Sequence, residues 1–201
     1  MICEIYKHGV EQWKKWDPPH LFIMNESINS VYSIDVPKIG LMPVDVLNRW
    51  MEKSESFPLY VCVGVIYPII DEFEETRKQF GIKQCISKQI KDYMVSLIEV
   101  TNGNQFNGIF PLLHMISGMD DLVVWSTDKD CFFIGDDYIR RDWFKQLPIH
   151  SAVQDGHTLY HLPPGGMSLD VYSNDVNLAT FSSLSKSLPS SVEAVFDIDE
   201  E

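Results

Sequence analysis

The order of its sequence patterns predicts that this chain folds as a combination of helices and strands. Apolar residues recur at helical spacing in residues 44–54 and 86–104. Residues 71–80 run from acidic to basic side chains, the order that a helix dipole favours. After residue 108 the patterns change to short apolar runs separated by turn residues, which are typical of strands. A last helical spacing follows at residues 176–188.

The N-terminal half is predicted to hold three helices and one buried strand. Residues 57–70 are nearly all apolar and rich in β-branched side chains, which indicates a strand that ends before Pro68. The helix of residues 71–80 has a natural stop at Gly81. The clearest amphipathic helix is predicted at residues 86–104, where one face would carry Ile86, Ile90, Tyr93, Met94, Leu97 and Ile98.

The C-terminal half is predicted to be mostly strands. Two apolar runs, 122–126 and 131–135, are separated by Thr-Asp-Lys-Asp and predict a hairpin. Residues 157–163 and 167–173 predict two further strands around a hard Pro-Pro-Gly-Gly turn. Residues 136–147 predict a short helix capped by Asp136. The final stretch, Val-Phe-Asp-Ile-Asp-Glu-Glu, predicts an edge strand or a frayed end.

The composition is that of a globular protein. The chain has 201 residues, 45% hydrophobic and 22% charged, which suits one fairly large domain or one domain with an extension. Neither an apolar run of roughly 18 residues nor a secretory signal pattern is seen, so a membrane span is not expected. Cys3, Cys62, Cys85 and Cys131 lack a C-x-x-C spacing, so we expect buried, reduced thiols and a cytoplasmic location.

The net charge of -13 is concentrated in the C-terminal part of the chain. Residues 119–201 contain 15 acidic and 5 basic side chains, and no Lys or Arg occurs between Lys145 and Lys186. Such a field repels phosphates, so direct nucleic-acid binding is not expected. It attracts a basic protein and speeds the encounter with it. An acidic surface also aids solubility, which is the alternative interpretation.

Two adjacent carboxylates, Asp136 and Asp137, raise the question of metal chemistry. A Gly-Asp-Asp catalytic turn lies between two strands, whereas here a helical pattern follows Tyr138, so a helix cap and a solvated turn are favoured. Asp128 and Asp130 flank a tight turn, but the residues after them supply none of the further ligands that a calcium loop needs.

The histidines are the other candidate metal ligands. A zinc site could be assembled from His150, His157, His161, His114 and Cys131. We interpret these histidines as structural or surface residues, and Cys131 as an inert core thiol because it lies in a strand pattern. The nucleophile elbow, the P-loop and the dinucleotide fingerprint are absent from the sequence. We therefore expect a non-enzymatic protein without cofactor or metal, and a small metal-dependent hydrolase is the alternative.

From residue 71 onward, the order of elements resembles that of the SUKH superfamily. An acidic helix that ends in Phe80-Gly81 precedes a pattern with Tyr93 that closes on Asn102-Gly103. The run Ile134-Gly135-Asp136 resembles the Ile-Gly-Asp strand end of that family. The final helix matches through Ala179, Phe181 and Leu184. The chain departs from the family at residues 83–87, which lack the usual Leu-Pro before the tyrosine helix.

The resemblance covers about residues 71–188 and implies both a fold and a function. The implied fold is α+β, with a single bent, mostly antiparallel sheet and flanking helices. Residues 1–70 would then be an N-terminal extension or subdomain packed on a domain of residues 71–201. Many bacterial members look like immunity proteins that bind and neutralise a toxin, often a nuclease, and others are regulatory proteins.

The predicted function is that of an immunity or inhibitor protein that covers a basic toxin with an acidic surface. A regulatory interaction module without a toxin partner is the alternative among binding proteins. Hot spots of interfaces often combine an aromatic residue with charged neighbours. The predicted partner-binding residues are Trp125, Asp128, Asp130, Asp136, Asp137 and Tyr138. Core packing is the alternative role for Trp125 and Tyr138.

Overall fold

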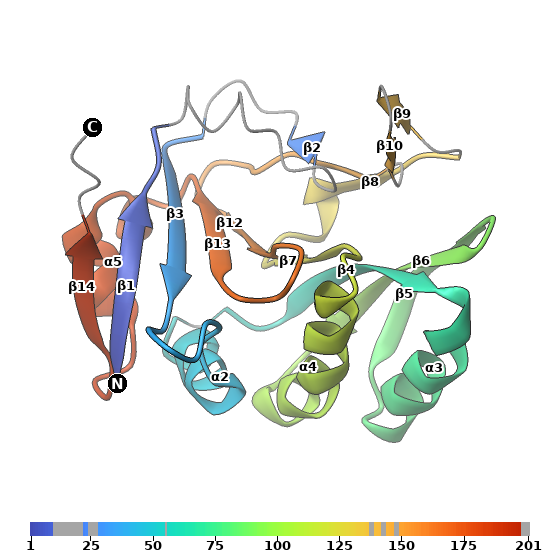
Figure 1. Ribbon diagram of the computed structural model, residues 1–201, viewed down its shortest axis with the longest axis horizontal. Helices are drawn as coiled ribbons and strands as arrows, with labels where there is room; N and C mark the ends of the chain where they lie inside the picture. The colour runs from blue at the N-terminus through green and yellow to red at the C-terminus, as the bar shows by residue number, and fades with distance from the viewer. Residues whose placement is uncertain are drawn as a thin grey trace.

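The structure is a computed structural model, and it describes the chain with several gaps. It leaves out residues 10–21, 24–27, 55, 137–138, 142–143, 147–148 and 198–201. For residues 22–23, 139–141, 144–146 and 197 it describes the backbone alone. The predicted α+β class is confirmed, because helices pack on one large, mostly antiparallel sheet (Figure 1).

The main sheet has nine strands in the order β14-β1-β3-β13-β12-β7-β4-β6-β5. Among these strands, β1 and β14 pair in parallel and all other neighbours pair antiparallel. The strands are β1 (Ile2–Lys7), β3 (Ser30–Asp35), β4 (Leu59–Ile66), β5 (Lys83–Ile90), β6 (Tyr93–Val100), β7 (Val123–Ser126), β12 (Thr158–Leu162), β13 (Leu169–Ser173) and β14 (Glu193–Asp197).

The helices cover one face of this sheet and enclose the larger core. Figure 1 shows α2, α4 and α3 next to one another below the sheet, with α5 beside β14. Trp50, Phe106, Trp125 and Tyr160 are large aromatic residues of this core, and all four are buried. The helices are α2 (Val44–Lys53), α3 (Ile70–Gln79), α4 (Gly103–Gly118) and α5 (Phe181–Ser187), with short 3-10 turns η1 (Tyr67–Ile69), η2 (Lys129–Cys131) and η3 (Val176–Leu178).

The opposite face of the sheet carries a second core under a small sheet. Here Cys62, Leu159 and Tyr172 of the main sheet are buried with Phe132 and Ile149. Those last two residues belong to the three-stranded sheet β2 (Phe22–Ile23), β11 (Ile149–Ser151) and β8 (Phe132–Ile134). A two-stranded sheet, β9 (Ile139–Arg141) and β10 (Phe144–Gln146), lies near β8 in Figure 1.

The helix predicted for residues 86–104 is wrong. Residues 86–100 lie in β5 and β6, which are joined by a reversal at Lys91-Asp92, where Lys91 adopts a φ of 53°, and α4 begins at Gly103. β6 lies between β4 and β5 and is buried along most of its length, so successive positions on it are apolar. A continuous apolar run matches helical spacing by coincidence, and β-branched content is the signal that favours a strand.

The sequence patterns did not predict the longest helix, α4. Asn102 begins it, since the Asn102 side chain accepts a hydrogen bond of 3.1 Å from the Gln105 N–H. Its glycines and Pro111 give this segment low intrinsic helix propensity. Tertiary packing explains the helix, because Gly103 lies against Asn48 of α2 and Gly108 against the ring of Phe80. A side chain at either glycine would overlap these neighbours.

Two further predictions in the C-terminal half are wrong. The runs 122–126 and 131–135 do not form a hairpin, because β7 pairs with β12 and β4 while η2 carries the chain to the small sheet, where β8 pairs with β11. The helix predicted at residues 136–147 is instead the β9–β10 pair. Asp136 caps no helix, since its Oδ1 accepts a hydrogen bond of 2.5 Å from Lys88 Nζ.

Several other elements agree with the sequence patterns. The helices at 44–54 and 71–80, the strand before Pro68 and the strands at 157–163 and 167–173 are confirmed. The last helical pattern is split into η3 and α5, and β14 is an edge strand of the sheet. In the main sheet, β1 and β3 from residues 1–70 lie between β14 and β13.

Candidate partner-binding edge and pocket

At one end of the neighbouring strands β13, β12 and β7 of the main sheet, three segments that are far apart in the sequence lie side by side. Across the sheet, Ser173 pairs with Thr158, the next residue Leu159 pairs with Ser126, and Ser126 pairs with Tyr60. The chain leaves the sheet just beyond this row in segments 174–177, 155–157 and 127–130. Backbone hydrogen bonds between Asn174 and the 156–157 turn hold the first two segments side by side.

Acidic residues concentrate in these three segments. Asp128 and Asp175 begin η2 and η3, where each carboxylate accepts a backbone N–H two residues on, at 2.9 Å and 2.8 Å respectively. Asp130 and Asp155 are exposed. Lys129 is also exposed between the two acids of η2. We call this group of Asp128, Asp130, Asp155 and Asp175 the acidic edge.

A pocket of about 460 Å³ opens at the acidic edge. That volume is within the range of roughly 300–1,000 Å³ found for small-molecule sites. Hydroxyl groups and two opposite charges dominate its walls, whereas Leu178 is the one large aliphatic residue in the lining. The pocket is lined by Lys53, Ser54, Ser56, Thr127, Gly156, His157, Thr158, Tyr160, Asp175, Asn177, Leu178 and Ser187.

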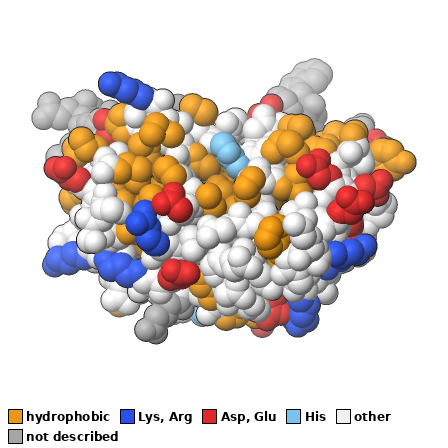
Figure 2. Space-filling view, turned by 90° about the horizontal axis from the view of Figure 1, so that it is seen from below, with side chains coloured by type: hydrophobic (Ala, Val, Ile, Leu, Met, Phe, Trp, Pro, Cys, Tyr) orange, Lys and Arg blue, Asp and Glu red, His pale blue; other side chains and the backbone are white. Residues whose placement is uncertain are grey.

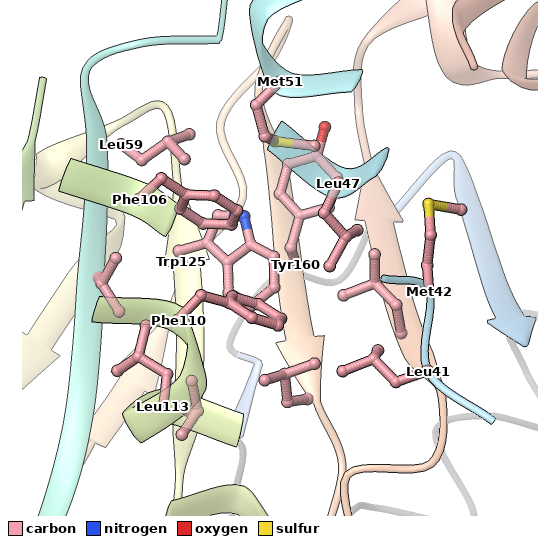
Figure 3. Packing of buried hydrophobic residues seen from close by; sticks show 14 of the residues in the cluster. Leu41, Met42, Leu47, Met51, Leu59, Phe106, Phe110, Leu113, Trp125 and Tyr160 are labelled. Carbon is pink, nitrogen blue, oxygen red and sulfur yellow. The ribbon is translucent and has the colours of Figure 1, made fainter. Parts of the chain in front are cut away.

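Tyr160 connects this pocket to the aromatic core. Its ring stacks on Trp125, with centroids 5.6 Å apart and 13° between the planes (Figure 3). It also makes a T-shaped contact with Trp50, with centroids 5.7 Å apart. Burial raises the pKa of the Tyr160 hydroxyl well above its usual value, and the Asp175 carboxylate raises it further. A hydrogen bond with Ser56 lowers it in part. The phenol therefore stays neutral and acts as a hydrogen-bonding group.

The structure separates the six predicted partner-binding residues. Trp125 is fully buried, so it contributes core packing and has no surface with which to contact a partner; its predicted role is corrected accordingly. Asp128 and Asp130 lie on the acidic edge. Asp136 lies elsewhere, where Lys88 of β5 binds it and lowers its pKa. Asp137 and Tyr138 fall outside the described residues.

The histidines considered for a zinc site are dispersed. His157 contacts Thr127 at 3.2 Å on the acidic edge, whereas His114 bonds the Gly166 carbonyl at 3.0 Å. His161 is buried 3.4 Å from Asp170. Within the described residues, no three His, Cys, Asp or Glu side chains are grouped to hold a metal ion. Cys131 is buried, and this burial raises the pKa of its thiol to about 12.

Exposed apolar side chains gather on the helix side of the molecule. Figure 2 shows this concentration of hydrophobic side chains, with a histidine among them. Gly40 is in close contact with Met167, and His114 bonds Gly166, so the loop before α2, the turn after β12 and α4 meet here. We call this group the helix-side patch; its exposed members are Ile39, Met115, Met119 and Met167. No local sequence pattern predicts this patch, because its members come from three segments.

Comparisons with protein-family models, with curated proteins and with solved structures find no match to this chain. Of the residues on which the predicted SUKH resemblance rests, Ile134 ends β8. Tyr93 lies on β6 instead of a helix, and Asn102 begins a helix instead of ending one. No helix among the described residues is long and apolar enough to cross a membrane.

Proposed function

We propose that this chain is a non-enzymatic binding protein of the immunity or inhibitor class that holds a basic protein against the acidic edge. One observation carries the proposal: three segments that together contain four carboxylates adjoin the same end of the neighbouring strands β7, β12 and β13. Complementary charge on a partner speeds association with such a surface and orients it.

The balance of charge on this edge supports a basic partner. In the three segments and the pocket lining, four acidic residues are accompanied by Lys53 and Lys129. Lys53 is already engaged, because its Nζ donates hydrogen bonds of 2.7 Å and 2.5 Å to the carbonyl oxygens of Lys186 and Leu188. Asp130 and Asp155 are exposed and neither begins a helix, so they are the carboxylates best placed to meet a partner's positive charge.

The partner is first captured with the full chain from the native host and identified by mass spectrometry. Its association rate is then measured at several salt concentrations with the wild type and with the double variant Asp130→Lys/Asp155→Lys. Because electrostatic steering acts mainly on association, we expect the variant to associate about tenfold or more slowly at low salt and with a weaker salt dependence. The matched control, Glu75→Lys/Glu193→Lys, makes the same change of charge at exposed sites on α3 and β14.

The helix-side patch is the competing interface. Exposed methionines are common at adaptable protein-binding surfaces, and apolar patches often mark such sites. If Met115→Glu/Met167→Glu abolishes binding while the acidic-edge variant associates like the wild type, the partner binds the patch and the proposed face is wrong. The immunity class is tested separately: co-expression of the chain with a toxic partner should restore growth, and failure to do so leaves a regulatory binding role.

A further inference from the structure

We propose that the pocket at the acidic edge binds a small zwitterion of the amino-acid class. The proposal starts from the two charges in its walls. Lys53 enters from the C-terminal end of α2, and Asp175 enters from the start of η3. Because both are lining residues of one pocket, a ligand held there meets a cation and an anion together.

Each charged group keeps bonding capacity for a ligand. An ammonium group has three protons, and Lys53 Nζ uses two of them on the carbonyl oxygens of Lys186 and Leu188. Asp175 Oδ1 accepts the Asn177 N–H, while Oδ2 has no hydrogen-bond partner in the part of the chain that the structure describes. The third Lys53 proton suits a carboxylate, and Asp175 Oδ2 suits an ammonium group.

The rest of the lining favours a polar ligand. Six residues with hydroxyl side chains line the pocket from four parts of the fold: Ser54, Ser56, Thr127, Thr158, Tyr160 and Ser187. The ring of Tyr160 is not available for stacking with a ligand, since Trp125 lies over one face and the residue is only 2% exposed. An apolar ligand would gain little here, whereas a small molecule with many hydrogen-bonding groups can replace its water contacts.

The charge pattern selects among polar ligands. A ligand with only positive charge would face Lys53 without compensation, and a ligand with only negative charge would face Asp175. A zwitterion satisfies both at once. This inference does not depend on the basic protein partner, because the pocket and its charges are present in the chain alone.

Binding is measured by titrating the wild-type chain with each of the proteinogenic L-amino acids at millimolar concentrations, by calorimetry and by tryptophan fluorescence. Two tryptophans report on occupancy: Trp50 donates a hydrogen bond of 3.0 Å to Ser187 in the lining, and Trp125 stacks on Tyr160. The amino acid that binds best is then compared with its α-amide, which lacks the carboxylate, and with its N-acetyl derivative, which lacks the ammonium. We expect about tenfold or more weaker binding of each derivative.

Variants test the assignment of the two charges. Asp175→Asn preserves the oxygen that begins η3 and removes the charge, so we expect about tenfold or more weaker binding. Asp128→Asn makes the same change at the start of η2, outside the lining, and should bind like the wild type. For the cation, Lys53→Met is the test variant, and Lys129→Met, outside the lining, is its control. Thermal unfolding of each variant shows whether it is folded.

Three results would overturn the proposal. One is that no L-amino acid binds the wild type at millimolar concentrations. Another is that the α-amide and the N-acetyl derivative bind as well as the parent amino acid. The third is an equal loss of affinity in Asp175→Asn and Asp128→Asn, which would indicate a general electrostatic effect. None of these results bears on association with a basic protein, which is measured separately.

Discussion

The rings of Trp125 and Tyr160 lie nearly parallel, with centroids 5.6 Å apart, and this pair links the helix-side core to the pocket. On one side Trp125 packs against Phe106 and Phe110 of α4, at 6.1 Å and 6.3 Å between centroids. On the other side Tyr160 forms part of the pocket wall. The two side chains come from adjacent strands, where Trp125 and Tyr160 are register partners.

This relationship predicts different costs for removing the hydroxyl and removing the ring of Tyr160. Tyr160→Phe keeps the stack and loses the hydrogen bond with Ser56, so the free energy of unfolding should fall by about 1 kcal/mol. Tyr160→Ala leaves a cavity beside Trp125 and should cost about 3–5 kcal/mol. Urea unfolding measures both values. An equal loss of unfolding free energy in the two variants would mean that the hydroxyl contact of Tyr160, and not its stacking on Trp125, supplies the stabilisation.

Asp121 predicts an unusual dependence of stability on pH. Burial raises its pKa from 3.8 to about 6, partly offset by a hydrogen bond with Tyr93, and Asp120 raises it further. The folded state therefore binds the proton more tightly than the unfolded state, and this carboxyl lowers stability as pH rises from about 4 to about 6. Asp121→Asn removes the buried charge, so it should stabilise the protein by about 2 kcal/mol above pH 6 and have little effect near pH 4.

The measurement is the difference in unfolding free energy between Asp121→Asn and the wild type at several pH values, which cancels the titration of the other carboxyls. The control is Asp155→Asn, which makes the same change at an exposed carboxylate distant in the sequence from Asp121. A difference that does not grow between about pH 4 and pH 6 would show that Asp121 is not a buried charge.

Local sequence patterns predicted those elements in which the spacing of apolar residues matches the burial of their side chains in the fold. α2 alternates buried and exposed faces, and the strand before Pro68 is an apolar run bounded by prolines, so both could be read from the sequence. The pattern at residues 86–104 could not, because both faces of β6 are buried, with Met94 and Ile98 in the helix-side core and Val95 and Leu97 in the second core. α4 was missed for a related reason, since close contacts of Gly103 and Gly108 compensate its poor propensity.

The candidate site could be predicted only in part. The excess of acid after residue 119 pointed to Asp128 and Asp130, which do lie on the acidic edge. Its acidic neighbours in the chain also predict Trp125 as a contact residue, but residues of a strand alternate between faces, and the Trp125 side chain is buried in the core. The pocket brings Lys53, His157 and Asp175 together through long-range pairing of strands, for which no local signal exists.

The cysteines predict selective thiol reactivity. Burial raises the pKa of Cys3 to about 11 and of Cys131 to about 12, and raises that of the fully buried Cys62 still further. The thiolate is the reactive form, and Cys85 is the partly exposed cysteine. In the native protein at pH 8 we expect a thiol reagent such as DTNB to label Cys85 quickly, and all four cysteines after unfolding. Cys85→Ser should abolish the fast phase; a remaining fast phase would show that a second thiol opens to solvent.

The close contact of Gly108 with Phe80 predicts that a substitution favoured by helix propensity will destabilise the protein. Gly108 lies inside α4, where Ala is intrinsically better than Gly by about 1 kcal/mol. The added methyl group would overlap the Phe80 ring, and relief of such overpacking costs about 1–3 kcal/mol, so Gly108→Ala should lower the free energy of unfolding. Gly118→Ala is the matched control in the same helix, because no atom lies within 4 Å of its added methyl group, and it should be neutral or stabilising. Equal stabilisation in both variants would show that α4 does not approach Phe80 this closely.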